Sequence, residues 1–440
     1  MNLAVVGTGY VGLVTGVVLS EIGHNVTCID NDALKIHKLR AGTPTIYEPG
    51  LQELLKKNVA GGRLHFTTDM REGVRDREVL YIAVGTPERA DGSADLKFVE
   101  QVTKDVVQYI SRDMIIVTKS TVPIGTNVKI KQWILEHLKI NCKVHVVSNP
   151  EFLREGSAIS DAFHGDRIVI GAENEESASK IEEINKPLGI PIFKTDLESA
   201  ELIKYASNAF LATKISFINE IATLSEMMGA NIDDVAVGMG MDHRIGNKFL
   251  NAGIGFGGSC FSKDVKAMIH TAKGTQCSLR LLQSVMELNY DQQRILISKV
   301  KNRFGNLKNK RVALLGLAFK PGTDDMREAP SLVIIEQLLQ EGAVVIGYDP
   351  AAMENCKKIV GVAITYADSI EQALSCADVA MILTEWDEFK SFDLTSLKNL
   401  MNEPILFDGR NCFTLESARE AEIEYISIGR RPSEIKIPVN

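Results

Sequence analysis

The chain opens on Asn2-Leu-Ala-Val-Val-Gly-Thr-Gly-Tyr-Val-Gly12, a short apolar run followed at once by a glycine-rich turn. Apolar residues then recur at helical spacing up to Glu21, and a second apolar run, Asn25–Ile29, ends at Asp30. A strand, a turn, a helix and a second strand in this order predict a parallel βαβ unit. Later apolar runs at Val79–Val84, Met114–Thr118 and Val144–Val147 extend the pattern. Together they predict an α/β protein with a doubly wound parallel sheet.

The glycine-rich turn has the spacing of a dinucleotide-binding fingerprint. Gly7 allows a tight turn, Gly9 lets backbone amides approach a pyrophosphate, and Gly12 permits close packing of helix on strand. The N-terminus of the following helix favours the phosphate charge. Asp30 follows about twenty positions later, where a carboxylate accepts both ribose hydroxyls and repels a 2′-phosphate. These residues predict NAD, rather than NADP, as the cofactor.

The same pattern recurs near the C-terminus. Strands are expected at Arg311–Leu315, Val379–Leu383 and Ile405–Phe407, and a helix is expected at Ser331–Gln340. The segment Gly342–Asp349 matches Gly23–Asp30, because in both a glycine precedes an apolar strand and an aspartate follows it. We therefore predict a second Rossmann-like domain. Its turn has only Gly316 where the first turn has three glycines, so it should hold a different ligand.

The segment from Ile192 to Met228 lies between the two halves and contains neither glycine nor proline. Its apolar residues recur at helical spacing, and Thr195 or Asp196 is expected to cap the helix. A helix of about 30 residues is roughly 45 Å long. That length favours a connector that also packs against another subunit over an ordinary buried helix. The predicted domains are therefore residues 1–196 (dinucleotide binding), 197–305 (helical, with dimer contacts) and 306–440 (second Rossmann-like domain).

Composition narrows the function. Lys plus Arg total 49 and Asp plus Glu total 57 among 440 residues, a net charge of −8 that argues against a broad nucleic-acid-binding surface. The 7 cysteines form no C-x-x-C pair, and the 8 histidines show no metal-ligand spacing. The apolar N-terminus is punctuated by glycines and lacks the basic start of a signal peptide. We expect a cytoplasmic protein with reduced thiols, no metal and no association with membranes or nucleic acid.

The strongest chemical signal is the segment Gly255-Phe-Gly-Gly-Ser-Cys-Phe-Ser-Lys-Asp264. Its glycine-rich loop delivers Cys260 to the start of a predicted helix, with Asp264 one turn later on the same face. A helix N-terminus makes a thiol more nucleophilic. A lone cysteine is more often a small buried apolar residue, but the glycine loop and the flanking charges favour a nucleophile here.

Further candidate residues lie on the long helix and after two strands. Lys204 and Asn208 stand at i and i+4 on the helix, a spacing that suits two oxyanion-stabilising donors as well as two solvated side chains. The segment Asn149–Gly156 carries two carboxylates after a predicted strand, and Ser120–Pro123 adds hydroxyls after another. Open α/β sheets bind ligands at the carboxyl ends of their strands, so both segments are expected at one edge.

These motifs together resemble the UDP-glucose/GDP-mannose dehydrogenase family over nearly the whole chain. The resemblance rests, in order, on Gly7–Leu13, Ile46–Leu51, Ser120–Pro123, Asn149–Gly156, Gly255–Asp264 and Phe319–Arg327. Departures are small: Ser262 and His243 stand where many relatives have proline, and Ala329 replaces a frequent serine. None of these positions is a candidate catalytic residue.

The resemblance implies oxidation of the C6 alcohol of a UDP-sugar to a carboxylate, with two NAD molecules used in succession. It implies that Cys260 adds to the intermediate aldehyde, giving a thiohemiacetal and then a thioester that water hydrolyses. Lys204 and Asn208 would stabilise the oxyanion, and Glu151 would act as the acid–base residue of the thioester step. Asp264 and Thr121 would organise the lysine and a water.

The resemblance also implies binding residues. Expected NAD contacts are Gly7, Gly9, Tyr10, Val11, Gly12, Asp30, Lys35, Thr86, Thr121, Glu155, Lys263 and Arg327. Expected substrate contacts are Glu151, Phe152, Leu153, Lys204, Asn208, Arg244, Phe249, Phe256, Gly257, Phe319, Lys320 and Arg410. Arg244 would reach in from the neighbouring subunit, which implies a homodimer.

The segments Phe256–Cys260 and Asp242–Gly246 look most like the UDP-glucose branch, whose product is UDP-glucuronate. UDP-galactose, differing in one hydroxyl orientation, stays open as a substrate. So does the chemistry of sister enzymes that act on GDP-mannose or UDP-N-acetylmannosamine. A β-hydroxyacid dehydrogenase shares the first domain and long helix but has no counterpart of Cys260. A nucleotide-bound regulatory protein would need the glycine fingerprints without the thiol.

Overall fold

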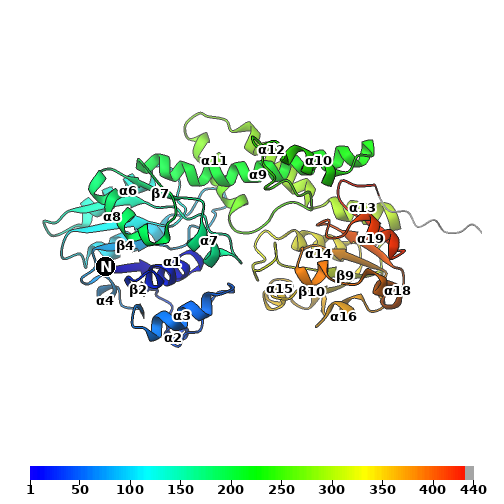
Figure 1. Ribbon diagram of the computed structural model, residues 1–440, viewed down its shortest axis with the longest axis horizontal. Helices are drawn as coiled ribbons and strands as arrows, with labels where there is room; N and C mark the ends of the chain where they lie inside the picture. Colours follow the sequence, from blue (N-terminus) through cyan, green and yellow to red (C-terminus); the bar gives the residue numbers. More distant parts are fainter. Residues whose placement is uncertain (432–440) are drawn as a thin grey trace, which may run out of the picture. The chain divides into compact units, whose positions relative to one another are not determined.

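The computed structural model describes residues 1–431, which divide into two compact units (Figure 1). Unit 1 comprises Met1–Ser207 with Lys266–Ser278, and unit 2 comprises Asn208–Val265 with the chain from Leu279 onward. Two helices, α9 (Leu197–Met228) and α11 (Phe261–Lys273), run through the boundary.

Unit 1 is built on an eight-stranded sheet with the order β3-β2-β1-β4-β5-β6-β7-β8. Its strands are β1 (Asn2–Val6), β2 (Asn25–Ile29), β3 (Leu64–Thr67), β4 (Val79–Ile82), β5 (Met114–Thr118), β6 (Val144–Ser148), β7 (Ile168–Ala172) and β8 (Ile192–Thr195). The order of the first six strands is that of a doubly wound dinucleotide-binding fold. One feature departs from the expected all-parallel sheet, because β6 pairs antiparallel with β7.

The helices of unit 1 connect these strands on the two faces of the sheet. They are α1 (Tyr10–Glu21), α2 (Ala33–Arg40), α3 (Leu51–Ala60), α4 (Met70–Val74), α5 (Lys97–Val107), α6 (Thr126–His137), α7 (Ala158–His164) and α8 (Glu175–Asn185). Alternate residues of β1 enter different cores: Leu3 and Val5 pack in one apolar cluster, Ala4 and Val6 in another. A parallel strand buried on both faces explains why the sequence shows a continuous apolar run rather than alternation.

Unit 2 contains a second sheet of the same design, with the order β11-β10-β9-β12-β13-β14 and parallel pairing throughout. Its strands are β9 (Arg311–Leu315), β10 (Val344–Tyr348), β11 (Thr365–Tyr366), β12 (Val379–Ile382), β13 (Ile405–Asp408) and β14 (Glu424–Ile426). Its helices are α14 (Pro330–Gln340), α15 (Met353–Val360), α16 (Ile370–Leu374), α17 (Asp387–Lys390), α18 (Leu397–Leu400) and α19 (Leu415–Glu420). The predicted repeat of one Rossmann-like fold is therefore confirmed.

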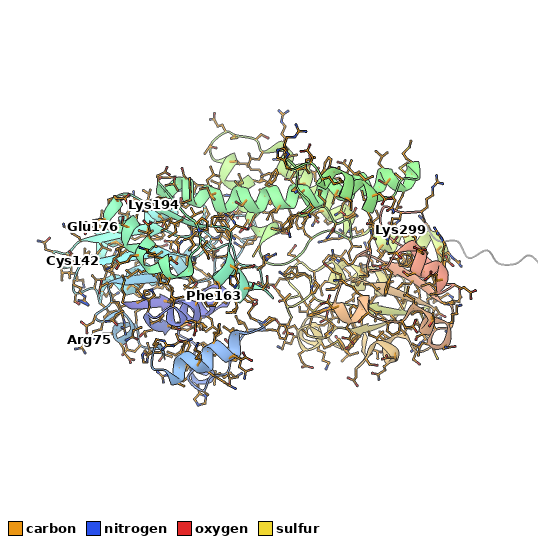
Figure 2. All side chains as sticks on the ribbon, in the orientation of Figure 1. Arg75, Cys142, Phe163, Glu176, Lys194 and Lys299 are labelled. Carbon is orange, nitrogen blue, oxygen red and sulfur yellow. The ribbon has the colours of Figure 1, made fainter. Side chains whose placement is uncertain are left out.

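The long helix α9 contains 32 residues and begins after Asp196, whose Oδ1 accepts a hydrogen bond from the Ser199 amide at 2.6 Å. Asp196 is thus the predicted cap. The remaining helices are α10 (Ile232–Gly240), α12 (Arg280–Gln292) and α13 (Ile295–Phe304). Lys299 of α13, labelled in Figure 2, pairs with Glu226 of α9 at 2.5 Å. Within the described part of the chain, none of the helices has the length and apolar character needed to cross a membrane.

Candidate active site

The glycine-rich turn between β1 and α1 has the geometry that a dinucleotide needs. Gly7 has φ +99°, and a Cβ there would lie 2.5 Å from the carbonyl oxygen of Ala83. A Cβ on Gly12 would overlap the carbonyl oxygen of Gly7, so helix and turn require glycine at both positions. Gly9, in contrast, faces open space, because a Cβ there meets no protein atom within 4 Å. No side chain caps α1 at Gly9, so its N-terminus is open to a phosphate.

Asp30 lies at the end of β2 beside this turn. Its Oδ2 accepts hydrogen bonds from the Thr8 amide at 2.8 Å and the Thr8 hydroxyl at 2.7 Å. Burial acts to raise the pKa of Asp30, but the hydrogen bonds from Thr8 and the Asp32 amide, with the charge of Lys35, lower it overall. The carboxylate is therefore anionic at neutral pH, as recognition of a ribose diol requires. These residues fit NAD.

Tyr10, in the first turn of α1, ties this turn to the loop after β6. Its hydroxyl donates to Glu48 and accepts a hydrogen bond from the Gly156 amide at 2.7 Å. Glu48 also accepts from the Gly156 amide at 2.7 Å. Burial and the bond to Glu48 raise the pKa of Tyr10, and the charge of Glu155 adds to the effect. Tyr10 also packs in an apolar cluster with Leu153 and with Phe163 of α7, which is labelled in Figure 2.

The loop after β6 carries a buried ion pair. Glu151 Oε1 lies 2.9 Å from Lys204 Nζ of α9, and the two side chains are only 6% and 5% exposed. The second carboxylate oxygen accepts a hydrogen bond from the Leu153 amide at 2.6 Å. The ring of Phe152 lies 3.7 Å from the Arg167 guanidinium and 5.4 Å from Lys204 Nζ. The predicted carboxylate and the predicted lysine are thus direct partners.

The segment after β5 is fixed by hydroxyl–carbonyl hydrogen bonds. Ser120 Oγ donates to the Val84 carbonyl at 2.7 Å, and Thr86 Oγ1 donates to the Thr121 carbonyl at 2.8 Å. The structure therefore brings together Thr86 and Thr121, both predicted NAD contacts, at the carboxyl ends of β4 and β5.

In unit 2, Cys260 immediately precedes α11, as predicted. The Asp264 amide donates to the Cys260 carbonyl at 2.9 Å, which closes the first helical turn. The Asp264 carboxylate is buried and binds two predicted site residues: it accepts from Asn208 Nδ2 at 2.7 Å and from Lys263 Nζ at 2.8 Å. Cys260 itself is half-buried. This arrangement places Cys260 one helical turn before a carboxylate that is anchored by an amide and an ammonium.

The loop before Cys260 is held by Asn289 of α12 and by Gln293, the residue after this helix, neither of which was predicted. Asn289 accepts from the Phe256 amide at 2.8 Å and donates to the Phe256 carbonyl at 3.1 Å, and Gln293 donates to the same carbonyl at 2.9 Å. Both side chains are buried. The Gly258 amide donates to the Arg327 carbonyl at 2.8 Å. The loop backbone is therefore rigid, which suits a nucleophile that must be presented in one orientation.

Several predicted substrate residues lie around this loop. The ring of Phe261 packs against Phe256 at 5.7 Å and Phe249 at 6.3 Å between centroids. A Cβ on Gly258 would lie 2.7 Å from the Phe319 ring, and a Cβ on Gly257 would overlap the Glu328 carbonyl oxygen, so both glycines permit close packing.

Two of the predicted substrate contacts, Arg410 and Lys320, are cations that the structure holds in different ways. Arg410 donates to the carbonyls of Leu383, Gly255 and Phe319 at 2.8, 3.0 and 3.4 Å, so it also clamps the loop. Lys320 lies over the Phe319 ring at 5.6 Å.

Two predicted arginines are exposed and paired with a neighbouring aspartate. Arg244 lies 2.6 Å from Asp242, and Arg327 lies 2.6 Å from Asp325. Arg244 follows α10 with its side chain 79% exposed.

The turn after the first strand of the second sheet, β9, differs from the turn after β1 in the accessibility of its carboxylate. Gly316 has φ +95°, close to the +99° of Gly7 at the equivalent place in the first turn. Asp349, the counterpart of Asp30, is 1% exposed and accepts from the amides of Leu317 and Ala318 and from Trp386 Nε1. Asp349 is therefore almost fully buried, whereas Asp30 is half-buried, so the second turn has no comparably accessible carboxylate.

Comparisons with known proteins agree with this architecture. Residues 1–189, 198–291 and 313–415 match the NAD binding, central and UDP binding domains of the UDP-glucose/GDP-mannose dehydrogenase family. The chain is 53% identical to the UDP-glucose 6-dehydrogenase YwqF of Bacillus subtilis, with 98% of each chain covered.

Two solved structures are similar over nearly their whole length. A UDP-glucose dehydrogenase from Pyrobaculum islandicum is 39% identical with a TM-score of 0.91, covering 97% of this chain and 96% of that one. A UDP-D-ManNAc dehydrogenase from Pyrococcus horikoshii is 27% identical with a TM-score of 0.87, covering 98% and 99%. With its three matching domains and its NAD-binding turn, the chain belongs to the UDP-glucose/GDP-mannose dehydrogenase family of NAD-dependent oxidoreductases.

Proposed function

We propose that this enzyme oxidises UDP-glucose to UDP-glucuronate through intermediates bound to Cys260. One observation carries the chemistry: Cys260 stands at the start of α11, one turn before an Asp264 carboxylate that binds Asn208 and Lys263. The similarity to proteins named UDP-glucose dehydrogenases supports the choice of substrate. The proposed domain roles are those given above for residues 1–196, 197–305 and 306–440. The 7 free cysteines suit a reducing cytoplasm.

When bound, NAD accepts a hydride in each of the two oxidations. The other steps are carried out by residues of the protein. The Cys260 thiolate adds to the C6 aldehyde produced by the first oxidation, and the carbonyl oxygen gains the negative charge of the broken π bond. Lys204 and Asn208 donate hydrogen bonds to that oxygen and stabilise the charge as it develops. Loss of hydride from the resulting thiohemiacetal leaves a thioester on Cys260.

Hydrolysis of the thioester requires a base and a good leaving group. Glu151 takes a proton from the attacking water, and the Cys260 thiolate leaves as the carboxylate forms. Asp264 holds Asn208, while Glu151 is oriented by Lys204 and the Leu153 amide. Thr121 helps to position the attacking water. Glu155 is a supporting carboxylate on the NAD side of the site.

We expect two NADH to form for each UDP-glucose consumed, because an alcohol must lose four electrons to become a carboxylate. NADH absorbance and product mass, measured together with a limiting amount of UDP-glucose, give this ratio. A ratio of one with free aldehyde would exclude the proposed mechanism. The same assay with UDP-galactose, GDP-mannose and UDP-N-acetylmannosamine tests the substrate, and NADP in place of NAD tests the role of Asp30.

We further propose a homodimer in which Arg244 completes the partner's active site. Unit 2 exposes large apolar side chains along one face of α9, where Phe210, Phe217 and Leu224 recur every seven residues. It also exposes Val237 of α10 and Met241, the residue after that helix. Phe210 is 66% exposed and Met241 82%. An apolar stripe of this kind marks a protein contact. Arg244 follows Met241 closely, which supports its placement at the subunit boundary.

Mixing two inactive variants tests this proposal. Arg244→Ala and Cys260→Ser should each be impaired alone, the former by roughly 30-fold or more in kcat/KM for UDP-glucose. In a mixed dimer, one site combines intact Cys260 with intact Arg244 from the other subunit. Random pairing makes about half of the dimers mixed, so co-expression should restore about one quarter of wild-type activity. If light scattering shows dimers but mixing restores no activity, Arg244 acts in the active site of its own subunit.

A further inference from the structure

Lys119, which directly follows β5, is a partly buried lysine without a role in the mechanism above. Its Nζ donates a hydrogen bond to Asn149 Oδ1 at 3.1 Å. The other end of that amide, Nδ2, donates to the Val169 carbonyl at 2.8 Å. The Asn149 amide is therefore fixed, because flipping it would turn its NH₂ group toward an ammonium and its oxygen toward a carbonyl. Lys119 thus anchors the first residue of the loop that carries Glu151.

Lys119 also adds a positive charge beside the buried ion pair. The charged groups that face it are Glu151, in the loop after β6, and Lys204, in α9. Burial lowers the pKa of Lys119 to about 8, the charge of Glu151 opposes this shift, and the charge of Lys204 adds to it. Since electrostatic interaction is mutual, protonated Lys119 attracts the Glu151 carboxylate and repels the Lys204 ammonium.

We propose that Lys119 is a positioning residue for catalysis, which holds the loop that carries Glu151 through Asn149 and adds a positive charge beside the Glu151 carboxylate. The inference rests on the function and the base role of Glu151 proposed above. A buried carboxylate is stabilised by neighbouring cations, because a buried charge without a partner is costly. Lys204 supplies one cation, but it is also assigned to the oxyanion, and Lys119 supplies a second.

Charge and anchoring can be separated by two substitutions. Lys119→Met removes both the ammonium and the hydrogen bond to Asn149, whereas Lys119→Arg keeps a positive charge that does not titrate below pH 12. Lys129→Met, on the exposed face of α6 in the same unit, is the matched control for losing one positive charge.

We expect Lys119→Met to lower kcat for UDP-glucose oxidation roughly 10- to 100-fold, with less than about 3-fold change in KM. Wild-type Lys119 loses its own charge as the pH rises through about 8, so the advantage of wild type over Lys119→Met should shrink there. Lys119→Arg should recover most of kcat and keep its advantage at pH above 9.

Each other outcome overturns the proposal. If Lys119→Met keeps the wild-type kcat, Lys119 has no role in catalysis. If Lys119→Arg is as impaired as Lys119→Met and both show a lower thermal unfolding temperature, Lys119 is only structural. If the wild-type enzyme turns over UDP-glucose but the Lys119 variants do not behave as expected, only this inference is refuted. Wild-type enzyme without that turnover refutes the proposed function, and the inference falls with it.

Discussion

Replacing Cys260 with serine should abolish conversion of UDP-glucose to UDP-glucuronate, with kcat lower by at least about 1,000-fold. A serine hydroxyl is scarcely ionised at neutral pH, so it adds to an aldehyde far less readily than a thiolate does. The ester that it would form also has a poorer leaving group than a thioester. The structure gives the variant no obstacle to folding, since Cys260 is half-buried and the loop is held through its backbone.

The measurement is NADH formation followed together with the mass of the sugar nucleotide and of the protein. Cys260→Ser is expected to accumulate either unreacted substrate or an intermediate attached to the protein. Cys277→Ser is the matched control, because Cys277 is an exposed thiol, and it should retain wild-type kcat. Wild-type production of the acid by Cys260→Ser would remove the nucleophilic role of Cys260.

The sheet centres were predicted from sequence because they are buried on both faces. The predicted apolar runs have the same bounds as four of the observed strands, β1, β2, β5 and β9. A fifth strand, β10, lies between the glycine and the aspartate of the segment Gly342–Asp349, as predicted. The outer strands gave no such signal. β3 and β8 have four residues each and include polar side chains, and β11 has only two. The antiparallel pairing of β7 depends on the path of the chain after β6, which no local pattern specifies.

The candidate site was predictable where one segment carries several functional groups. Cys260 and Asp264 lie one helical turn apart, and the i, i+4 spacing of Lys204 and Asn208 is visible in the sequence. Contacts between distant segments were not predictable. Asn289 binds Phe256 across 33 residues, and Glu48 binds the Gly156 amide across 108. Glu48 lies inside a motif that the family shares, but only the fold shows that its carboxylate binds Tyr10 and the Glu151 loop.

Replacing Lys204 with methionine should lower kcat roughly 100- to 1,000-fold, the range for loss of one oxyanion donor. It should also destabilise the protein, because Lys204 and Glu151 are a buried pair with only 5% and 6% of their side chains exposed. Removing Lys204 takes away the direct ion-pair partner of a buried carboxylate and leaves only the charge of Lys119 beside it, so the free energy of unfolding should fall by at most about 3–5 kcal/mol. Denaturant unfolding and steady-state kinetics on the same preparation measure the two effects.

The double variant Lys204→Met/Glu151→Gln separates them. With both charges removed, no carboxylate is left unpaired, so most of the lost stability should return. Activity should not return, because the oxyanion donor and the base are both missing. If the double variant recovered activity along with stability, the effect of Lys204→Met would be structural. If Lys204→Met kept the wild-type free energy of unfolding, the 2.9 Å pair with Glu151 would not be a stabilising contact in solution. A fall in kcat with that stability intact would then assign Lys204 to the chemistry alone.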